Sequence, residues 1–186
     1  MKTIEKVKIG SAVFAVIVIL LFLHHVLPRT AVVQITGTDV KRHDRSSGKI
    51  VETTAGGRVK EKTLSTQDVR YINSLSRKGK TMVFRNEDTG WGWPPYFKFD
   101  SADLTARAQA FAADQDKQWV IVKYYGWRIK IFSMFPNAVT LKQVNRNYSH
   151  FPLFNIAFFI ALAILAFFLR SKYKALMDWL NNRKKK

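Results

Sequence analysis

The sequence predicts an α+β membrane protein in which N- and C-terminal transmembrane helices flank a small β-rich, OB-like barrel with one helix. An apolar block without Asp, Glu, Lys or Arg lies near each end of the 186-residue chain. About 120 residues separate the two blocks, which is enough for one full domain. Hydrophobic residues make up 47% of the chain, yet its mean hydropathy is only −0.11. Apolar and polar residues are therefore segregated along the sequence.

The first apolar block comprises residues 9–27, IGSAVFAVIVILLFLHHVL. As a helix it spans roughly 28 Å, about the thickness of the hydrocarbon core of a bilayer. The alternative is a cleaved signal peptide, because three lysines within residues 1–8 precede the block. Cleavage after Ala31 would place Arg29 where a small residue is required. We therefore expect an uncleaved anchor.

The second apolar block comprises residues 151–169, FPLFNIAFFIALAILAFFL, and a tail with seven Lys and Arg residues follows it at 170–186. Basic flanks of membrane spans stay in the cytoplasm, so residues 1–8 and the tail should both be cytoplasmic. The central domain, residues 28–150, should then lie outside the cytoplasm, which in a bacterial inner membrane means the periplasm. Its 21 basic and 11 acidic residues do not oppose this topology, because long loops translocate largely regardless of charge.

The central domain shows the patterns of short strands and one helix. We expect the helix over residues 101–116, with Ser101 as its N-cap. Residues 41–57 are polar and predict either a long turn or a mobile hairpin that bends near residues 55–57. One helix between the third and fourth strands of a roughly five-stranded domain is the order of an OB-like barrel. The expected strands are 30–41, 68–75, 81–85, 118–125, 127–132 and 139–144.

Two segments carry a family resemblance. They are TGWGWPPYFKFDSADLTARAQ, residues 89–109, and YYGWRIKIFSMFPNAVTL, residues 124–141. The chain resembles a family of uncharacterised bacterial envelope proteins, classed as a domain of unknown function, over almost its whole length. The resemblance implies two transmembrane helices, a periplasmic domain between them and a bacterial origin. It implies no activity and no functional residues.

The most unusual segment is residues 90–97, which are rich in aromatic residues, glycine and proline. We predict that this segment docks a partner. Tryptophan and tyrosine bury a large area at small entropic cost, which suits them to interfaces. The alternative is a rigid loop that folds its rings onto the barrel. The candidate docking residues are Trp91, Trp93, Pro94, Pro95, Tyr96 and Phe97.

Several residues are predicted to lie at the membrane interface. His24 and His25 fall at the outer end of the first span, where polar rings reach the headgroups. The tail could form an amphipathic helix on the inner leaflet, or it could simply continue the second helix with ordinary basic residues, which we favour. Its candidate interface residues are Trp179, Lys184, Lys185 and Lys186.

We expect no catalytic, cofactor or metal site. The chain has no cysteine, and no GxSxG, P-loop or HExxH pattern occurs. Asp39, His43 and Asp44 could supply metal ligands, but such a trio is ordinary for a polar loop. The aromatic and basic residues of 123–132 could bind nucleic acid, but a half-exposed strand explains them and a periplasmic domain meets little nucleic acid.

These observations favour a non-enzymatic accessory subunit whose periplasmic domain binds or scaffolds another membrane protein complex. The expected partners are the lipid bilayer and another membrane protein or a second copy of the chain. The alternative function is binding of an anionic lipid or an envelope glycan by the basic central domain.

Overall fold

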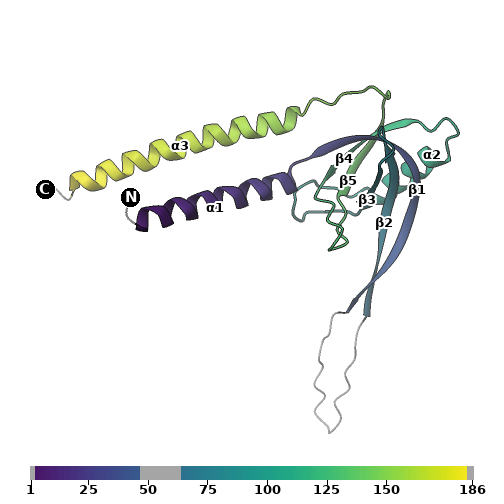
Figure 1. Ribbon diagram of the computed structural model, residues 1–186, viewed down its shortest axis with the longest axis horizontal. Coiled ribbons are helices and arrows are strands. Elements are labelled where there is room, and N and C mark those ends of the chain that lie inside the picture. Colours follow the sequence, from purple (N-terminus) through teal and green to yellow (C-terminus); the bar gives the residue numbers. More distant parts are fainter. Residues whose placement is uncertain (1–2, 47–63, 184–186) are drawn as a thin grey trace, which may run out of the picture. The chain divides into compact units, whose positions relative to one another are not determined.

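The computed structural model describes residues 3–46 and 64–183. The chain forms two compact units, Met1–Tyr148 and Ser149–Lys186, which we describe separately. The first unit holds the helix α1 and the barrel domain, and the second holds the helix α3 (Figure 1). In chain order the elements are α1 (Thr3–Val26), β1 (Arg29–Ser46), β2 (Leu64–Ser76), β3 (Thr81–Asn86), α2 (Ser101–Ala113), β4 (Trp119–Tyr125), β5 (Asn137–Gln143) and α3 (Leu153–Arg183).

The five strands close into a barrel in the order β1-β2-β3-β5-β4, with β1 pairing β4 to complete the ring. Among these strands, the β3–β5 pair is parallel and the other pairs are antiparallel. The first part of β1, Arg29–Gln34, pairs with β4, and β1 pairs with β2 from Val33 onward. The barrel and the helix between its third and fourth strands agree with the prediction from sequence.

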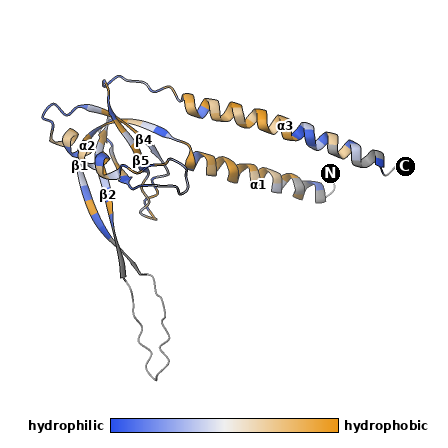
Figure 2. Ribbon diagram, turned by 180° about the vertical axis from the view of Figure 1, so that it is seen from behind, coloured by the Kyte–Doolittle hydropathy of each residue, from blue (hydrophilic) through white to orange (hydrophobic). Residues whose placement is uncertain are grey.

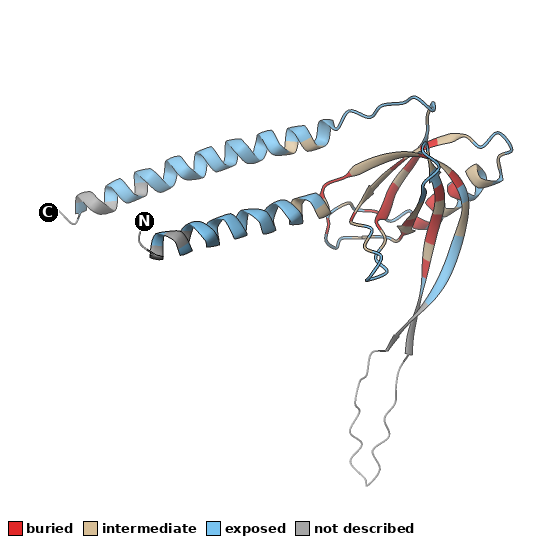
Figure 3. Ribbon diagram, viewed as in Figure 1, coloured by how far each residue is buried: buried red, intermediate tan, exposed pale blue. Residues whose placement is uncertain are grey.

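The interior of the barrel is apolar, and α2 closes one side of it. Phe84, Val33 and Val120 are fully buried there. Leu104 and Ala108, four residues apart on α2, join the same cluster because that spacing places them on one helix face. Burying side chains of this size stabilises the fold by about 1.5–3 kcal/mol each. The red segments in Figure 3 mark this core.

The start of α2 corrects one prediction. Ser101 is the first residue of the helix rather than its N-cap, which is Asp100 without a side-chain cap bond. The carboxylate of Asp88 instead accepts hydrogen bonds from the backbone N–H and hydroxyl of Ser101, at 2.9 and 2.7 Å. A carboxylate at a helix N-terminus satisfies free N–H groups and complements the helix dipole. Asp88 lies two residues after the end of β3, so this cap also ties the helix to the barrel.

The strand predicted at 127–132 is wrong. This segment belongs to the β4–β5 loop, residues 126–136, which contains only one isolated bridge, between Ile129 and Met134. Gly126 ends β4 with φ at +89° and Ser133 has φ at +48°, so the chain turns sharply at both places. The alternation of apolar and basic residues therefore lies along a tight loop rather than a strand.

The pairing of β1 with β2 also extends beyond the predicted strands. The ladder continues to the pair Ser46 and Leu64, so residues 41–46 of the predicted turn are strand. Backbone hydrogen bonds need no apolar side chains, which explains why the hydropathy pattern does not reveal this extension. The rest of the predicted turn lies outside the described residues.

The helices α1 and α3 contain segments long and apolar enough to cross a membrane, Ile9–Val26 and Leu153–Trp179. Figure 2 shows their apolar stretches in orange, and Figure 3 shows them exposed. The exposed large apolar side chains of α1, between Val7 and Phe22, range from 47% exposed at Val18 to 68% at Phe14. The basic tail continues α3 as helix to Arg183. Two apolar helices thus flank the barrel domain, an arrangement compatible with membrane insertion.

Candidate functional site at the end of the first helix

Two loops of the barrel domain hold the last turn of α1. One is the aromatic loop, residues 89–99, which connects β3 to α2, and the other is the β4–β5 loop. Each makes backbone or side-chain hydrogen bonds to α1, and each places an aromatic ring against a ring of α1. The end of the apolar helix is therefore fixed to the barrel rather than joined to it by a free linker.

The aromatic loop contacts α1 through two rings. The ring of Trp93 stacks on that of Phe22, with centroids 6.0 Å apart and planes 8° apart. The hydroxyl of Tyr96 donates a hydrogen bond to the carbonyl of Val26 at 2.6 Å. Tyr96 also stacks on Tyr125, with centroids 4.6 Å apart. Burial, and then the neighbouring Tyr125, raise the pKa of Tyr96, so its hydroxyl keeps the proton that it donates.

The β4–β5 loop contacts the same turn through Gly126 and Trp127. The N–H of Gly126 donates to the carbonyl of His25 at 2.9 Å, and the guanidinium of Arg29 donates to the Gly126 carbonyl. The indole N–H of Trp127 donates to Nδ1 of His24 at 2.8 Å. The Trp127 ring also meets the His25 ring edge-on at 5.0 Å. Both predicted interface histidines are thus in contact with this loop.

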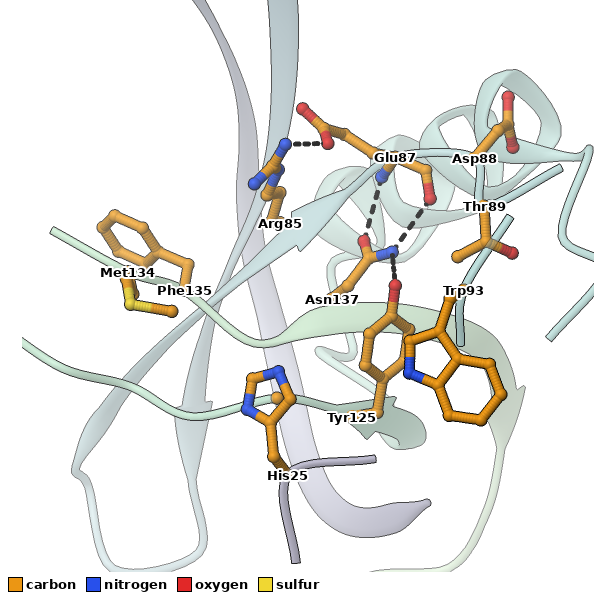
Figure 4. A pocket seen from close by; sticks show the side chains of 11 residues that line it. His25, Arg85, Glu87, Asp88, Thr89, Trp93, Tyr125, Met134, Phe135 and Asn137 are labelled. Atoms are coloured by element: carbon orange, nitrogen blue, oxygen red, sulfur yellow. Dashed lines mark hydrogen bonds and ion pairs between the residues drawn. The ribbon is translucent and has the colours of Figure 1, made fainter. Parts of the chain in front are cut away.

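A pocket of about 320 Å³ lies between these loops and the last turn of α1 (Figure 4). It combines charged, amide and aromatic side chains from α1, β3, β4, β5 and both loops. Its lining residues are His25, Arg85, Glu87, Asp88, Thr89, Trp93, Tyr125, Gly126, Met134, Phe135 and Asn137.

Asn137 organises the pocket. Its Oδ1 accepts from the backbone N–H of Glu87 at 3.0 Å, and its Nδ2 donates to the Glu87 carbonyl and the Tyr125 hydroxyl, each at 3.0 Å. The Glu87 carboxylate forms an ion pair with Arg85. Burial raises the pKa of Tyr125, although the hydrogen bond from Asn137 opposes this. These contacts fix the end of β3 against β5.

Three residues that line the pocket each have one buried polar atom without a hydrogen-bond partner in the described part of the chain. These atoms are Nδ1 of His25, Nε of Arg85 and Oε1 of Glu87. Most buried polar atoms in proteins have a partner, and an exception calls for a bound molecule or a functional reason. A ligand in the pocket could supply the missing partners after a small movement of these side chains.

A buried lysine lies beside the pocket. Lys98 is 3% exposed, and its ammonium donates to Oδ1 of Asn86 and to the Ala138 carbonyl, the latter at 2.7 Å. Nδ2 of Asn86 in turn donates to the Ser101 carbonyl and the Thr105 hydroxyl, each at 2.8 Å. Burial lowers the pKa of Lys98 to about 8, although nearby carboxylates oppose the shift, Asp100 most.

The predicted docking residues divide into a group that is buried or half-buried and a group that is exposed. Pro94 is buried and Tyr96 is half-buried against α1, as the alternative of an inward-folded loop expects. Trp91, which is 85% exposed, meets Phe97 and Phe99 edge-on at 5.5 and 5.7 Å. We call these three residues the ring cluster. The remaining predicted docking residues, Trp93 and Pro95, are exposed.

The other predicted residues belong to α3, to the end of the chain and to β1. Trp179 is exposed on α3 and the Arg183 guanidinium lies 4.1 Å from its ring centroid. Lys184, Lys185 and Lys186 lie outside the described residues. Asp39 accepts a hydrogen bond from Asn73 at 2.6 Å, and the side chains of His43 and Asp44 are not described.

Sequence reasoning missed most of the pocket. Asn137 lies 50 residues after Glu87 and belongs to no motif with Arg85 and Glu87, so only the closed barrel brings it to them. Lys98 carried one usable signal, because a lone charge between Phe97 and Phe99 in an aromatic loop must either reach solvent or find buried partners.

The fold defines a small closed-barrel protein flanked by two apolar helices. Residues 4–177 match the family described as "Protein of unknown function (DUF1523)", and the chain belongs to that family. It is 41% identical over 138 residues to an uncharacterised protein of Haemophilus influenzae, covering 70% of this chain and 74% of the relative. The predicted resemblance to an uncharacterised bacterial family is thus confirmed. No solved structure matches the chain.

Proposed function

We propose that this protein is a non-enzymatic accessory subunit of the bacterial inner membrane, whose periplasmic barrel docks another membrane protein. The observation that carries the proposal is the ring cluster. Its members Trp91, Phe97 and Phe99 are 85%, 55% and 57% exposed, and they contact one another rather than the core. Exposed apolar rings held together in one place are typical of binding hot spots.

The position of the ring cluster favours a partner that is itself in the membrane. The aromatic loop that carries the cluster reaches Phe22, four residues before the end of α1. Four residues correspond to about 6 Å along a helix axis. If α1 spans the bilayer, this loop meets the outer boundary of the membrane, where another membrane protein can contact it.

The rigidity of the aromatic loop supports the same role. Tyr96 is hydrogen-bonded to α1 and stacked on Tyr125. The backbone N–H of Gly90 donates to the Lys98 carbonyl at 3.0 Å, which closes the base of the loop. A surface fixed before binding loses less conformational entropy when the partner arrives.

Site-specific photo-crosslinking in cells tests this proposal. A photoreactive residue at Trp91 should form a discrete adduct with one membrane protein, and Phe97→Ala should weaken that adduct. The matched control is Val40, which is 61% exposed on β1 outside the aromatic loop. Identical adducts from both positions, or purification in mild detergent without any reproducible partner, would contradict the proposal. An adduct of twice the chain mass would identify a second copy as the partner.

A further inference from the structure

We propose that the pocket at the end of α1 binds the zwitterionic headgroup of a phospholipid, with the ammonium at Glu87 and the phosphate at Arg85. This inference goes beyond the docking role and uses residues outside the ring cluster. It requires that α1 spans the membrane, and it does not require a protein partner.

The pocket lies at the level where the apolar helix ends. His25, the second-last residue of α1, lines it. Trp93 also lines it and stacks on Phe22, within the last two turns of the same helix. In a bilayer the end of a spanning helix meets the headgroups, and Trp and Tyr rings concentrate there. A headgroup of the outer leaflet can therefore reach the pocket while its acyl chains remain beside α1.

One part of the pocket suits an ammonium. Oε1 of Glu87 is a buried carboxylate oxygen without a donor in the described part of the chain. The rings of Trp93 and Tyr125 line the same cavity. Carboxylates accept hydrogen bonds from an ammonium and aromatic ring faces attract its charge, so both kinds of group in this cavity favour a cation. A water molecule could also donate to the carboxylate, but it carries no charge that the rings of Trp93 and Tyr125 would attract.

Another part of the pocket suits a phosphate oxygen. Within the described residues, Nε of Arg85 is a buried donor without an acceptor, and Nδ1 of His25 is a second buried nitrogen without a partner. Guanidinium groups bind phosphate oxygens through charge-assisted hydrogen bonds. The imidazole can donate from the same nitrogen in one of its tautomers.

The charges of the pocket select against a purely anionic headgroup. Glu87 and Asp88 both line the cavity against the single guanidinium of Arg85. Glu87 is already paired with Arg85, and Asp88 already caps α2, so an anionic headgroup would add a third negative charge beside these carboxylates without bringing a cation. The volume of about 320 Å³ is at the lower end of small-molecule sites, which fits a headgroup rather than a whole lipid.

Native mass spectrometry of the full chain tests this assignment. The protein is released from micelles containing equal amounts of phosphatidylethanolamine and phosphatidylglycerol with identical acyl chains. We expect preferential retention of phosphatidylethanolamine. Glu87→Gln keeps the size of the side chain and removes its charge, and it should reduce that retention about tenfold. Trp93→Leu should also reduce it, and because Trp93 is 67% exposed this change spares the core.

Asp116→Asn is the matched control, because it too replaces a carboxylate with an amide. Asp116 is exposed and lies before the start of β4, whereas Tyr125 of the pocket lies at the other end of that strand. The control should retain lipid as the wild type does. Equal retention of the two lipids, preference for phosphatidylglycerol, or a Glu87→Gln protein indistinguishable from Asp116→Asn would overturn the assignment. At a concentration equal to that of the lipid, soluble glycerophosphoethanolamine should displace little of it, because it lacks acyl chains that can lie beside α1. Full displacement at that concentration would mean that the ligand is a soluble phosphodiester instead.

Discussion

At the scale of single residues, Lys98 makes the stability of the barrel depend on pH. Its pKa is about 8 in the folded protein, against 10.5 for a lysine that is not buried. Between these values the unfolded chain binds more protons than the folded one, so the free energy of unfolding increases with pH. Below pH 8 the buried charge costs about 3 kcal/mol relative to a neutral lysine, and this cost disappears as pH rises toward 10.5.

We therefore predict that the thermal midpoint of the full chain in detergent increases between pH 8 and 10. Lys98→Met removes the titrating group and should remove this increase. The tyrosines do not obscure the window, because the raised pKa values of Tyr96 and Tyr125 affect stability only as pH rises above 10. Parallel pH profiles of the two proteins would show that Lys98 is not the cause.

Asn137 is the second residue with a specific role. Asn137→Ala leaves the backbone N–H and carbonyl of Glu87 without the amide that they contact beside the pocket. We predict a loss of about 2–4 kcal/mol in the free energy of unfolding, measured by denaturant titration. Asn145→Ala is the control, since Asn145 is exposed and its backbone carbonyl, which the substitution keeps, accepts from the N–H of Tyr148. The unfolding free energy of the control should remain within about 0.5 kcal/mol of the wild type. A similar loss in both proteins would mean that the hydrogen bonds between Asn137 and the Glu87 backbone do not stabilise the fold.

At the scale of elements, the β4–β5 loop depends on one glycine. Gly126 has φ at +89°, and its N–H donates to the end of α1. A Cβ there would meet Cα of Pro136 at 3.5 Å, an ordinary contact, so the cost of Gly126→Ala is that of the backbone conformation. We predict a loss of about 1–2 kcal/mol, measured as a lower thermal midpoint.

Gly37→Ala is the matched control for this change. Gly37 also lies in the barrel, its φ is not in the left-handed region, and a Cβ there meets nothing within 4 Å. Its substitution should not lower the midpoint. A Gly126→Ala protein as stable as the wild type would mean that the loop can hold α1 without the left-handed turn.

Elements with one clear pattern could be predicted from the sequence, and the contacts between elements could not. The apolar helices, α2 and β4 follow from periodicity and length. The β2 strand shows the limit of such patterns. Val69 and Tyr71 are buried on one side, and Ile72 and Ser74 on the other. The ring of Phe135, in the β4–β5 loop, contacts the ring of Tyr71 with centroids 5.1 Å apart. No local sequence pattern reveals that a residue about sixty positions away covers this side of β2.

The candidate site was only partly predictable for the same reason. The composition of the aromatic loop marks it as unusual, but composition does not separate rings that turn inward from rings that turn out. Tyr96 turns toward α1 because Val26 offers a carbonyl at the helix end, where the last backbone acceptors lack intrahelical partners. Trp91 instead packs on Phe97 and Phe99.

At the scale of the whole molecule, both apolar helices need a membrane or a partner to cover them. The apolar side chains of α1 are about half exposed, and none of the 18-residue apolar window in either helix is buried. Hydrocarbon lipid is the environment in which such a surface is stable and in which helices satisfy their own backbone hydrogen bonds. With both helices in a bilayer, the basic flanks at the two ends favour cytoplasmic termini and a periplasmic barrel.

Single-cysteine labelling checks this topology cleanly, because the chain contains no cysteine of its own. Lys78→Cys lies in the exposed turn between β2 and β3, and Ser171→Cys lies on α3 beyond the predicted span. A membrane-impermeant maleimide should label the first variant in intact spheroplasts and the second only after permeabilisation. The unmodified chain, which cannot react, measures the background. Labelling of Ser171→Cys in intact spheroplasts would place the tail outside and would also remove the topological basis for a headgroup site at the end of α1.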